Sequence, residues 1–347
     1  MSRRLLLLAL LGPALAAQAW RPVEAGTTAE LRGLAVAGPE VVWITGSAGT
    51  VKVSEDGGAH WRSCVVPGGE GLDFRAVVAM DATRAWVLSA GPGDQGRIYR
   101  TTDGGRSWTL QFRNPPGEGF LDALAFQDDR HGLALGDPIR GRFQILRTED
   151  GGATWAAVGG ASLAALPEEG AFAASNTCLR MNAAGEAWFA TGSARQARVF
   201  HSGDGGRSWT AAEVPVPAGE ASKGLFSLAL LGGGRGLAFG GDHQQPGLTT
   251  LNGALTEDGG RSWRPAPVLP GGYRSGSSAV PGLPGAVVTV GLTGTGLSLD
   301  GGRTWKILDE APLNAVAFQG RDGWAVGPKG RVMRLDGDLA PSRASAP

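Results

Sequence analysis

Three arginines stand at the second position of one repeated six-residue apolar pattern, and together they could bind a carboxylate. They are Arg32 in LRGLAV, Arg75 in FRAVVA and Arg274 in YRSGSS. A planar guanidinium pairs bidentately with a carboxylate, so three of them at one place would suit a carboxylate ligand or an acidic peptide. The alternative is that each arginine pairs with a carboxylate or carbonyl group of a neighbouring repeat as part of the packing.

Other polar residues could join such a site. Asn314 in LNAVAF and Asp122 in LDALAF hold the same second position, and Asp137 in GDPIRG and Asp242 in GGDHQQPG stand in expected loops after the next strand. Loops carry function more often than strands do, although an Asp beside Gly or Pro is also ordinary turn chemistry. We predict that the partner-binding residues are Arg32, Arg75, Asp122, Arg274, Asn314, Asp137 and Asp242.

A second motif, Ser/Thr-x-Asp-Gly-Gly-x-x-Trp, occurs six times, as in TTDGGRSW at Thr101 to Trp108. The Gly-Gly pair supplies the positive φ of a tight turn, and the Asp before it can accept hydrogen bonds from the turn. Each aspartate stands alone in its own turn, so the six cannot form a paired-carboxylate site. We predict a structural role for Asp56, Asp103, Asp150, Asp204, Asp258 and Asp300, and for Trp61, Trp108, Trp155, Trp209, Trp263 and Trp305.

The spacing of these motifs predicts an all-β propeller. The six aspartates lie 42 to 54 residues apart, and periods of about 40 to 50 residues with turn signals are typical of four-stranded blades. The six-residue apolar pattern occurs seven times, once more than the turn motif, with NTCLRM (Asn176 to Met181) and LFSLAL (Leu225 to Leu230) completing the set. We therefore expect seven four-stranded antiparallel blades, each with this pattern as its innermost strand.

The ring is expected to close through the N-terminal strand. The last repeat ends after RVMRLDG (Arg331 to Gly337) without a final strand, whereas Ala19-Trp20-Arg21-Pro22 matches Ser262-Trp263-Arg264-Pro265. The segment from Trp20 can complete the last blade and remove its open edge. We expect one propeller domain over residues 20–337 and a disordered tail over 338–347.

The first residues have the order of a secretory signal peptide. Arg3 and Arg4 precede an apolar run from Leu5 to Leu11, which is followed by small residues ending at Ala19. We expect cleavage after Ala19, with Ala16 as the second choice. Export by the general or the twin-arginine route would then lead to the periplasm, or to the lumen in a photosynthetic host. No second apolar stretch approaches the roughly 20 residues of a membrane span. Without Arg3 and Arg4, 30 basic residues face 32 acidic ones, a balance that does not suggest nucleic-acid binding.

The sequence offers no cofactor or metal motif. Cys64 and Cys178 fall at different places in different repeats, so we do not expect a disulfide, and the four histidines are scattered. There is no strand-to-helix G-x-G-x-x-G and no haem-attachment CxxCH. We predict no cofactor, no metal and no catalytic residue.

The turn motif resembles the Asp-box of sialidase-type (BNR) repeats. Together with HGLALGDPIRGRF (His131 to Phe143), GYRSG (Gly272 to Gly276) and GWAVGPKGRVMRL (Gly323 to Leu335), it makes nearly all of the chain after residue 19 similar to the photosystem II stability/assembly factor family, in particular its exported bacterial relatives. That resemblance implies a seven-bladed propeller, lumenal in photosynthetic members, that helps a new reaction-centre subunit assemble. We expect a monomeric, non-catalytic protein whose partner is a protein or peptide, such as a membrane-complex subunit.

The enzyme alternative is a glycoside hydrolase, because sialidases and some glucan hydrolases also carry Asp-boxes on propellers. Arg32, Arg75 and Arg274 could imitate the arginine triad of a sialidase, with Tyr273 beside them. The Phe-Arg-Ile-Pro entry motif is missing, since FRAV at Phe74 to Val77 lacks the proline, and seven repeats differ from the six blades of sialidases. The sequence therefore favours the binding protein.

Overall fold

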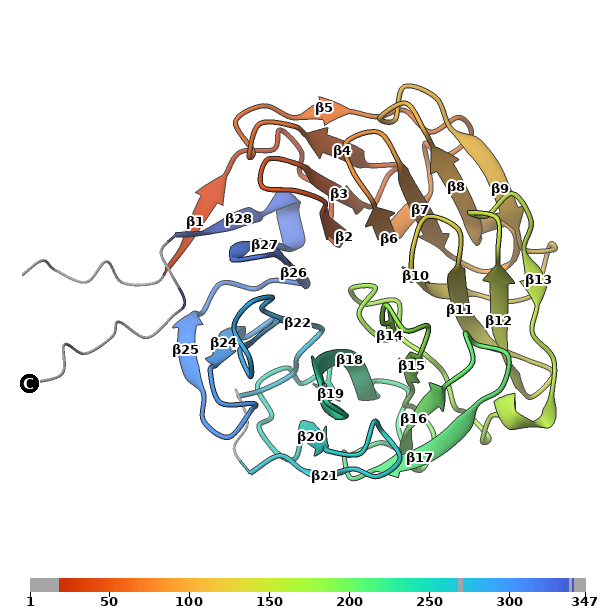
Figure 1. The fold of residues 1–347 in the computed structure, drawn as a ribbon, viewed down its shortest axis with the longest axis vertical. Coiled ribbons are helices and arrows are strands. Elements are labelled where there is room, and N and C mark those ends of the chain that lie inside the picture. Colours follow the sequence, from red (N-terminus) through yellow and green to blue (C-terminus); the bar gives the residue numbers. More distant parts are fainter. Residues whose placement is uncertain (1–18, 268–270, 337–338, 340–347) are drawn as a thin grey trace, which may run out of the picture.

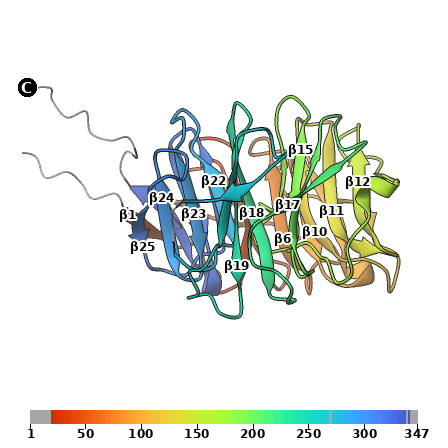
Figure 2. The same ribbon diagram turned by 90° about the horizontal axis from the view of Figure 1, so that it is seen from below.

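The computed structural model describes residues 19–267, 271–336 and 339. Within them, seven four-stranded antiparallel sheets are arranged in a ring (Figure 1), which confirms the predicted seven-bladed propeller. We call the region at the centre of the ring, next to the inner strands, the channel. The strands cross the thickness of the disc (Figure 2), and each blade runs from an inner strand at the channel to an outer strand at the rim. The signal peptide expected over residues 1–19 lies outside the described residues except for Ala19, and so does most of the expected tail.

The strands of blades one to four, from the channel outward, are as follows. Blade one contains β2 (Leu31–Val36), β3 (Val42–Gly46), β4 (Val51–Ser54) and β5 (Arg62–Ser63). Blade two contains β6 (Asp73–Ala79), β7 (Ala85–Ala90), β8 (Arg97–Thr101) and β9 (Thr109–Arg113). Blade three contains β10 (Leu121–Phe126), β11 (Gly132–Ile139), β12 (Arg142–Thr148) and β13 (Ala156–Ala157). Blade four contains β14 (Leu179–Met181), β15 (Ala187–Ala190), β16 (Ala197–Ser202) and β17 (Thr210–Val214).

Blades five to seven follow the same order. Blade five contains β18 (Lys223–Gly232), β19 (Arg235–Asp242), β20 (Gly253–Thr256) and β21 (Arg264–Pro265). Blade six contains β22 (Gly276–Ala279), β23 (Val287–Gly291), β24 (Gly294–Ser298) and β25 (Lys306–Asp309). Blade seven contains β26 (Ala315–Gln319), β27 (Asp322–Val326), β28 (Val332–Asp336) and β1 (Ala19–Val23). Three short 3-10 helices lie in the loops: η1 (Gly93–Gln95), η2 (Ala161–Leu163) and η3 (Pro328–Gly330).

The N-terminal strand closes the ring as the sequence predicted. β1 pairs antiparallel with β28, with Trp20 opposite Leu335 (Figure 1, where red β1 adjoins blue β28). The Trp20 side chain is buried, and its Nε1 donates a 2.9 Å hydrogen bond to Oγ1 of Thr295 in blade six. The first strand of the chain therefore ties the last two blades together.

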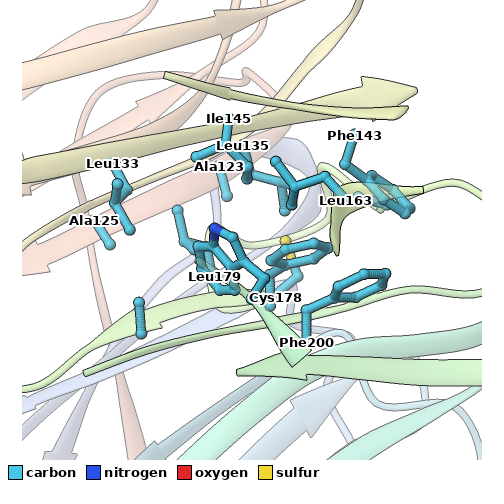
Figure 3. Packing of buried hydrophobic residues seen from close by; sticks show 14 residues of the cluster. Ala123, Ala125, Leu133, Leu135, Phe143, Ile145, Leu163, Cys178, Leu179 and Phe200 are labelled. Atoms are coloured by element: carbon cyan, nitrogen blue, oxygen red, sulfur yellow. The ribbon is translucent and has the colours of Figure 1, made fainter. Parts of the chain in front are cut away.

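Apolar side chains fill the spaces between adjacent blades. Between blades three and four, for example, Leu133 and Ile145 face Leu179 and Phe200 (Figure 3). Because one sheet cannot bury its two faces alone, each blade uses both neighbours to do so. Cys64 and Cys178 are buried in different interfaces and are not joined by a disulfide.

The Asp-box turns hold their aspartates inside small hydrogen-bond rings. In the turn of blade two, Thr101 Oγ1 donates to Asp103 Oδ1 at 2.8 Å and accepts from the Gly105 N–H at 2.8 Å. The hydroxyl of Ser107 donates to Asp103 Oδ2 at 2.6 Å, and its N–H to Oδ1 at 2.9 Å. These last two bonds lower the pKa of Asp103 to about 2. Gly104 and Gly105 have φ of 75° and 77°, which explains the glycine pair.

Two inner strands are shorter than the sequence patterns predicted. The pattern Asn176 to Met181 yields β14 over Leu179–Met181, and the pattern from Tyr273 to Ser278 yields β22 over Gly276–Ala279. Asn176 takes a left-handed backbone with φ of 66°, which ends extended pairing before β14. In blade six, the Arg274 N–H donates to the carbonyl oxygen of Gly240 in blade five, outside its own sheet. Both strands therefore begin where the chain returns from contacts with other blades.

Candidate functional site

The second position of the six-residue inner-strand pattern is a β-bulge in four of the blades. In blade one the pairing passes from Leu31 opposite Gly46 to Gly33 opposite Thr45, so Arg32 has no partner in the ladder. The same shift occurs at Arg75, Asp122 and Phe226. A bulge redirects the extra side chain and is common beside functional sites. The bulge thus takes these four side chains out of the regular alternation of their strands.

The channel is crossed by a segment that the repeat pattern did not reveal, residues 171–175, which we call the channel segment. Nη1 of Arg75 donates to the carbonyl oxygen of Ala173 at 3.4 Å. Nη1 of Arg32 donates to the carbonyl oxygen of Ala174 at 3.3 Å. The segment thus joins blades one and two from the loop that precedes blade four, and its sequence AFAAS carries no repeat signal.

Blades three and six hold the other sides of the channel segment. The N–H of Ala171 donates to Oδ1 of Asp137 at 2.9 Å, and the Ser175 hydroxyl donates to the carbonyl oxygen of Ser275 at 2.6 Å. The segment is therefore fixed by four blades at once. Its residues 172–174 line one side of the pocket described next, and we call that side the floor.

A pocket of about 220 Å³ lies above the channel segment. The rings of Phe172 and Phe226 are stacked with centroids 3.9 Å apart, and Tyr273 meets Phe226 edge-on at 4.8 Å. This aromatic wall adjoins the two guanidinium groups of Arg32 and Arg75. The lining residues are Arg32, Arg75, Phe172, Ala173, Ala174, Phe226, His243, Tyr273, Leu292 and Asn314.

Both pocket arginines keep part of their side chains open to solvent, with relative exposures of 26% for Arg32 and 31% for Arg75. Each has an acidic neighbour two residues before it: Glu30 Oε1 lies 3.4 Å from Nη2 of Arg32, and Asp73 Oδ2 lies 2.7 Å from Nε of Arg75. A guanidinium has five N–H donors, so these pairs orient the arginines without using all of their donors. The pocket combines fixed positive charge with an apolar wall.

Arg274 is placed away from this pair. Its side chain is buried, and its Nη1 donates to the carbonyl oxygen of Tyr273 at 3.1 Å and to Thr293 Oγ1 at 2.6 Å. Burial lowers its pKa to about 10. The structure therefore brings Arg32 and Arg75 together in the pocket, while Arg274 supports the wall behind Tyr273.

Asn314 lies at the pocket edge and links two blades. Its Nδ2 donates to Glu30 Oε1 at 2.7 Å and to the carbonyl oxygen of Leu31 at 2.9 Å. Through Glu30 it reaches Arg32, so blade seven helps to orient the blade-one guanidinium.

Asp122 and Asp137 form a carboxyl pair on the blade-three side of the channel. Burial raises the pKa of Asp122 well above its usual value, the charge of Asp137 raises it further, and Arg75 opposes both. Burial also raises the pKa of Asp137, against the hydrogen bond from Ala171. Neither carboxyl lines the pocket, and Asp137 binds the channel segment instead.

Asp137 and Asp242 lie in second strands, β11 and β19, and not in the loops that the sequence predicted, because both strands extend past the expected turn. Asp242 is the last residue of β19 and caps the loop that follows. Its Oδ1 accepts the N–H of Gln244 at 2.9 Å, and its Oδ2 accepts Nε2 of Gln245 at 3.3 Å. Burial raises its pKa, but hydrogen bonds from the Ser222 hydroxyl and from the backbone N–H groups of Gln244 and Gln245 outweigh burial, so the pKa is lowered. The next residue, His243, lines the pocket, and the geometry thus assigns Asp242 to holding that loop.

Within residues 19–267, 271–336 and 339, no three His, Cys, Asp or Glu side chains lie where they could hold a metal ion. In the same part of the chain, no helix is long and apolar enough to cross a membrane.

Comparison with known proteins supports the resemblance that the sequence predicted. A family model described as photosynthesis system II assembly factor YCF48 matches residues 12–119. A photosystem II assembly lipoprotein Ycf48 of Synechococcus sp. (strain CC9902) is 28% identical over 151 residues, which cover 42% of this chain and 41% of that protein. The chain thus spans about two fifths of the length of that relative. The resemblance to this assembly-factor family is confirmed.

Two solved structures share the fold. A structure of YCF48 bound to D1 peptide matches with a TM-score of 0.66 and 20% identity, covering 95% of this chain and 100% of that one. The GH74 xyloglucanase from Xanthomonas campestris matches with a TM-score of 0.63 and 21% identity, covering 94% of this chain and 55% of that one. At these identities both comparisons show the fold alone, and the glycoside hydrolase alternative stays a prediction.

Proposed function

We propose that this chain is an exported, non-catalytic polypeptide-binding protein that acts as an assembly or stability factor, and that its partner docks in the channel pocket. One observation carries the proposal. The solvent-accessible guanidinium groups of Arg32 and Arg75 stand beside an aromatic wall formed by Phe226 and Tyr273, above a fixed floor. Arginine and aromatic side chains are the residues that most often anchor a polypeptide at an interface.

Within the molecule, these two arginines already bind the backbone of a polypeptide segment. Arg32 and Arg75 donate to successive main-chain carbonyl oxygens of the channel segment. A partner segment lying above the floor would meet the remaining N–H donors of the same guanidiniums. A carboxylate, from a side chain or a chain end, would bind them more strongly than a carbonyl, because charge-assisted pairs are roughly twice as strong.

The relatives suggest the kind of partner. Proteins named as photosystem II assembly factors match this chain in sequence, and one matching structure holds a D1 peptide. By analogy, this chain would hold a newly made subunit of a membrane complex outside the cytoplasm, in the periplasm or a thylakoid lumen. We propose that it acts as a monomer.

Overlapping peptides from a cyanobacterial D1 subunit, each labelled with a fluorophore, provide the test. The chain should bind at least one of them, and the double variant Arg32→Glu with Arg75→Glu should bind it more than tenfold less tightly, because charge repulsion replaces pairing. The matched control is Arg113→Glu with Arg264→Glu, two exposed arginines on outer strands with the same total charge change. Equal binding by the pocket variant and the control, both folded by circular dichroism, would refute the pocket as the site.

A further inference from the structure

A second pocket, of about 480 Å³, opens between blades four and five on the face that carries the Asp-box turns. Trp188 of β15 and Trp263 of the blade-five turn line it, together with Leu228 and Leu230 of β18 and the glycine turn of residues 232–234. We call it the interblade pocket. It is formed at the opposite ends of the strands from the channel pocket, which lies where the inner strands begin.

Adjacent blades meet through a pair of tryptophans at three other places in the ring. At two of these junctions, the two indole rings contact each other directly. In each, a tryptophan of the second strand approaches the box tryptophan of the next blade. Trp43 meets Trp108 edge-on with ring centroids 6.3 Å apart, and Trp324 meets Trp61 at 6.2 Å. The inner-strand residues that end beside these two pairs are small, Ala79 and Val36, so the two indoles can touch.

The third junction, between blades two and three, is closed by an inserted ring. Phe126, the last residue of β10, stacks on Trp86 with centroids 4.2 Å apart and meets Trp155 edge-on at 6.0 Å. On its other face, Trp86 carries the guanidinium of Arg100 at 5.1 Å from the ring centroid. The molecule thus shows that a phenyl ring fits between a second-strand tryptophan and a box tryptophan.

We call the pair of a second-strand tryptophan and the box tryptophan of the next blade the tryptophan frame. The junction between blades four and five has this frame, but no phenylalanine ring is inserted in it. Leu230 stands opposite Gly236 as Phe126 stands opposite Gly132, so the two residues hold the same position in their blades. The indole of Trp188 donates to the carbonyl oxygen of Gly259 at 2.8 Å, just as Trp86 donates to Gly151 at 2.9 Å.

The two tryptophans of this junction do not close it themselves. His201 stacks on one face of Trp188, with centroids 4.9 Å apart, in the place that Arg100 has on Trp86. Trp263 turns its Nε1 toward the carbonyl oxygen of Gly260 in its own turn, at 3.2 Å. Among the described residues, Trp188 and Trp263 form no ring contact with each other, and the interblade pocket remains between them.

We propose that the interblade pocket binds an aromatic side chain of a partner polypeptide, in the position that Phe126 occupies between blades two and three. The pocket is larger than one phenyl ring, so backbone on either side of the aromatic residue can enter with it. The exposed glycine turn of residues 232–234 lines the pocket edge and offers main-chain groups to that backbone. The site is independent of the channel pocket.

The test uses two capped tripeptides as probes, acetyl-Gly-Phe-Gly-amide and acetyl-Gly-Leu-Gly-amide, observed by NMR titration of the full chain. We expect the phenylalanine peptide to bind about fivefold more tightly, because ring pairs add to simple area burial. Leu230→Phe places the chain's own ring in the pocket and should abolish this binding while raising the melting temperature. Equal binding of the two peptides, or unchanged binding to a folded Leu230→Phe variant, would overturn the proposal.

The reciprocal variant keeps the proposal testable if Leu230→Phe does not fold. Phe126→Leu opens the equivalent junction between Trp86 and Trp155, so the number of phenylalanine-peptide sites should rise from one to two. A Phe126→Leu variant that gains no site would show that the tryptophan frame does not recognise the ring. Arg32→Glu with Arg75→Glu should leave the interblade site unaffected, and lost binding there would contradict its independence.

Discussion

Arg32 of the first inner strand donates a hydrogen bond of 3.3 Å to the carbonyl oxygen of Ala174, a residue 142 positions later in the chain. With the parallel contact from Arg75 to Ala173, it fixes the channel segment across the ring. The same guanidiniums therefore have two tasks: they stabilise the floor of the channel pocket, and they face the space above it. Both arginines thus take part in packing, and their partly exposed guanidiniums are the groups that we propose for binding.

Removing either guanidinium should loosen the channel segment. In Arg32→Ala or Arg75→Ala we expect the closed position of residues 171–175 to lose about 1 kcal/mol, a typical value for one partly exposed hydrogen bond. Hydrogen exchange followed by mass spectrometry should show faster exchange in the peptide that contains Ala173. Arg113→Ala serves as the control, and unchanged exchange in both channel variants would contradict the role assigned to the arginines.

Asp122 should make stability fall as pH rises. Its folded-state pKa is raised by burial and by Asp137, with Arg75 opposing, so the folded state holds a proton that the unfolded state releases above its ordinary value of about 3.8. Stability is therefore lost as pH increases from that value through the raised pKa. Asp122→Asn should remove this loss, and its free energy of unfolding relative to the native chain should increase with pH.

Urea denaturation between pH 4.5 and 8 measures this difference. The surface change Asp129→Asn is the control, because its side chain is half exposed. If Asp122→Asn is less stable than the native chain by the same amount at every pH, the buried carboxyl does not titrate as described.

The Asp-box aspartates should act in the opposite direction. Hydrogen bonds from the Ser107 hydroxyl and N–H lower the pKa of Asp103 to about 2. Its stabilising contribution is present above the unfolded value of about 3.8 and is lost as pH falls toward 2. Asp103→Asn should lower the melting temperature at pH 7, and the deficit should shrink below pH 4. A constant deficit across this range would show that the charge of Asp103 is not what the turn requires.

Closure of the ring depends on Trp20. Its side chain is 5% exposed and packs between the last two blades, so Trp20→Ala should cost about 3 to 5 kcal/mol of unfolding free energy. Trp20→Phe keeps most of the apolar surface and loses the bond to Thr295, which should cost about 1 kcal/mol. Chemical denaturation distinguishes the two values, and a near-native Trp20→Ala would mean that the ring holds without its closing strand.

Glycines at the ends of second strands permit a close approach of backbones. A Cβ on Gly240 would lie 1.8 Å from the carbonyl oxygen of Gly224. Gly240→Ala should therefore destabilise blade five by on the order of 3 kcal/mol through overpacking. Gly247, in the loop of the same blade, has nothing within 4 Å of its would-be Cβ, so Gly247→Ala is the control. Similar melting temperatures for the two variants would contradict this account.

The sequence by itself determined the seven blades, the Asp-box corners and the closing strand at Trp20. These features depend on short-range chemistry that recurs with the period of the repeat: a glycine pair with positive φ, an aspartate that caps the turn, and an inner strand of apolar residues. Because each signal lies within a few residues of chain, it can be read before any tertiary contact is known.

Only the tertiary structure decided which residues share a site. It placed Arg32 and Arg75 in one pocket, buried Arg274 behind Tyr273, and brought the channel segment into contact with both pocket arginines. It also left the junction beside Leu230 open while Phe126 filled the equivalent one. These outcomes depend on bulges, non-repeating loops and the packing of one blade on the next, which join residues far apart in sequence and leave no periodic signal.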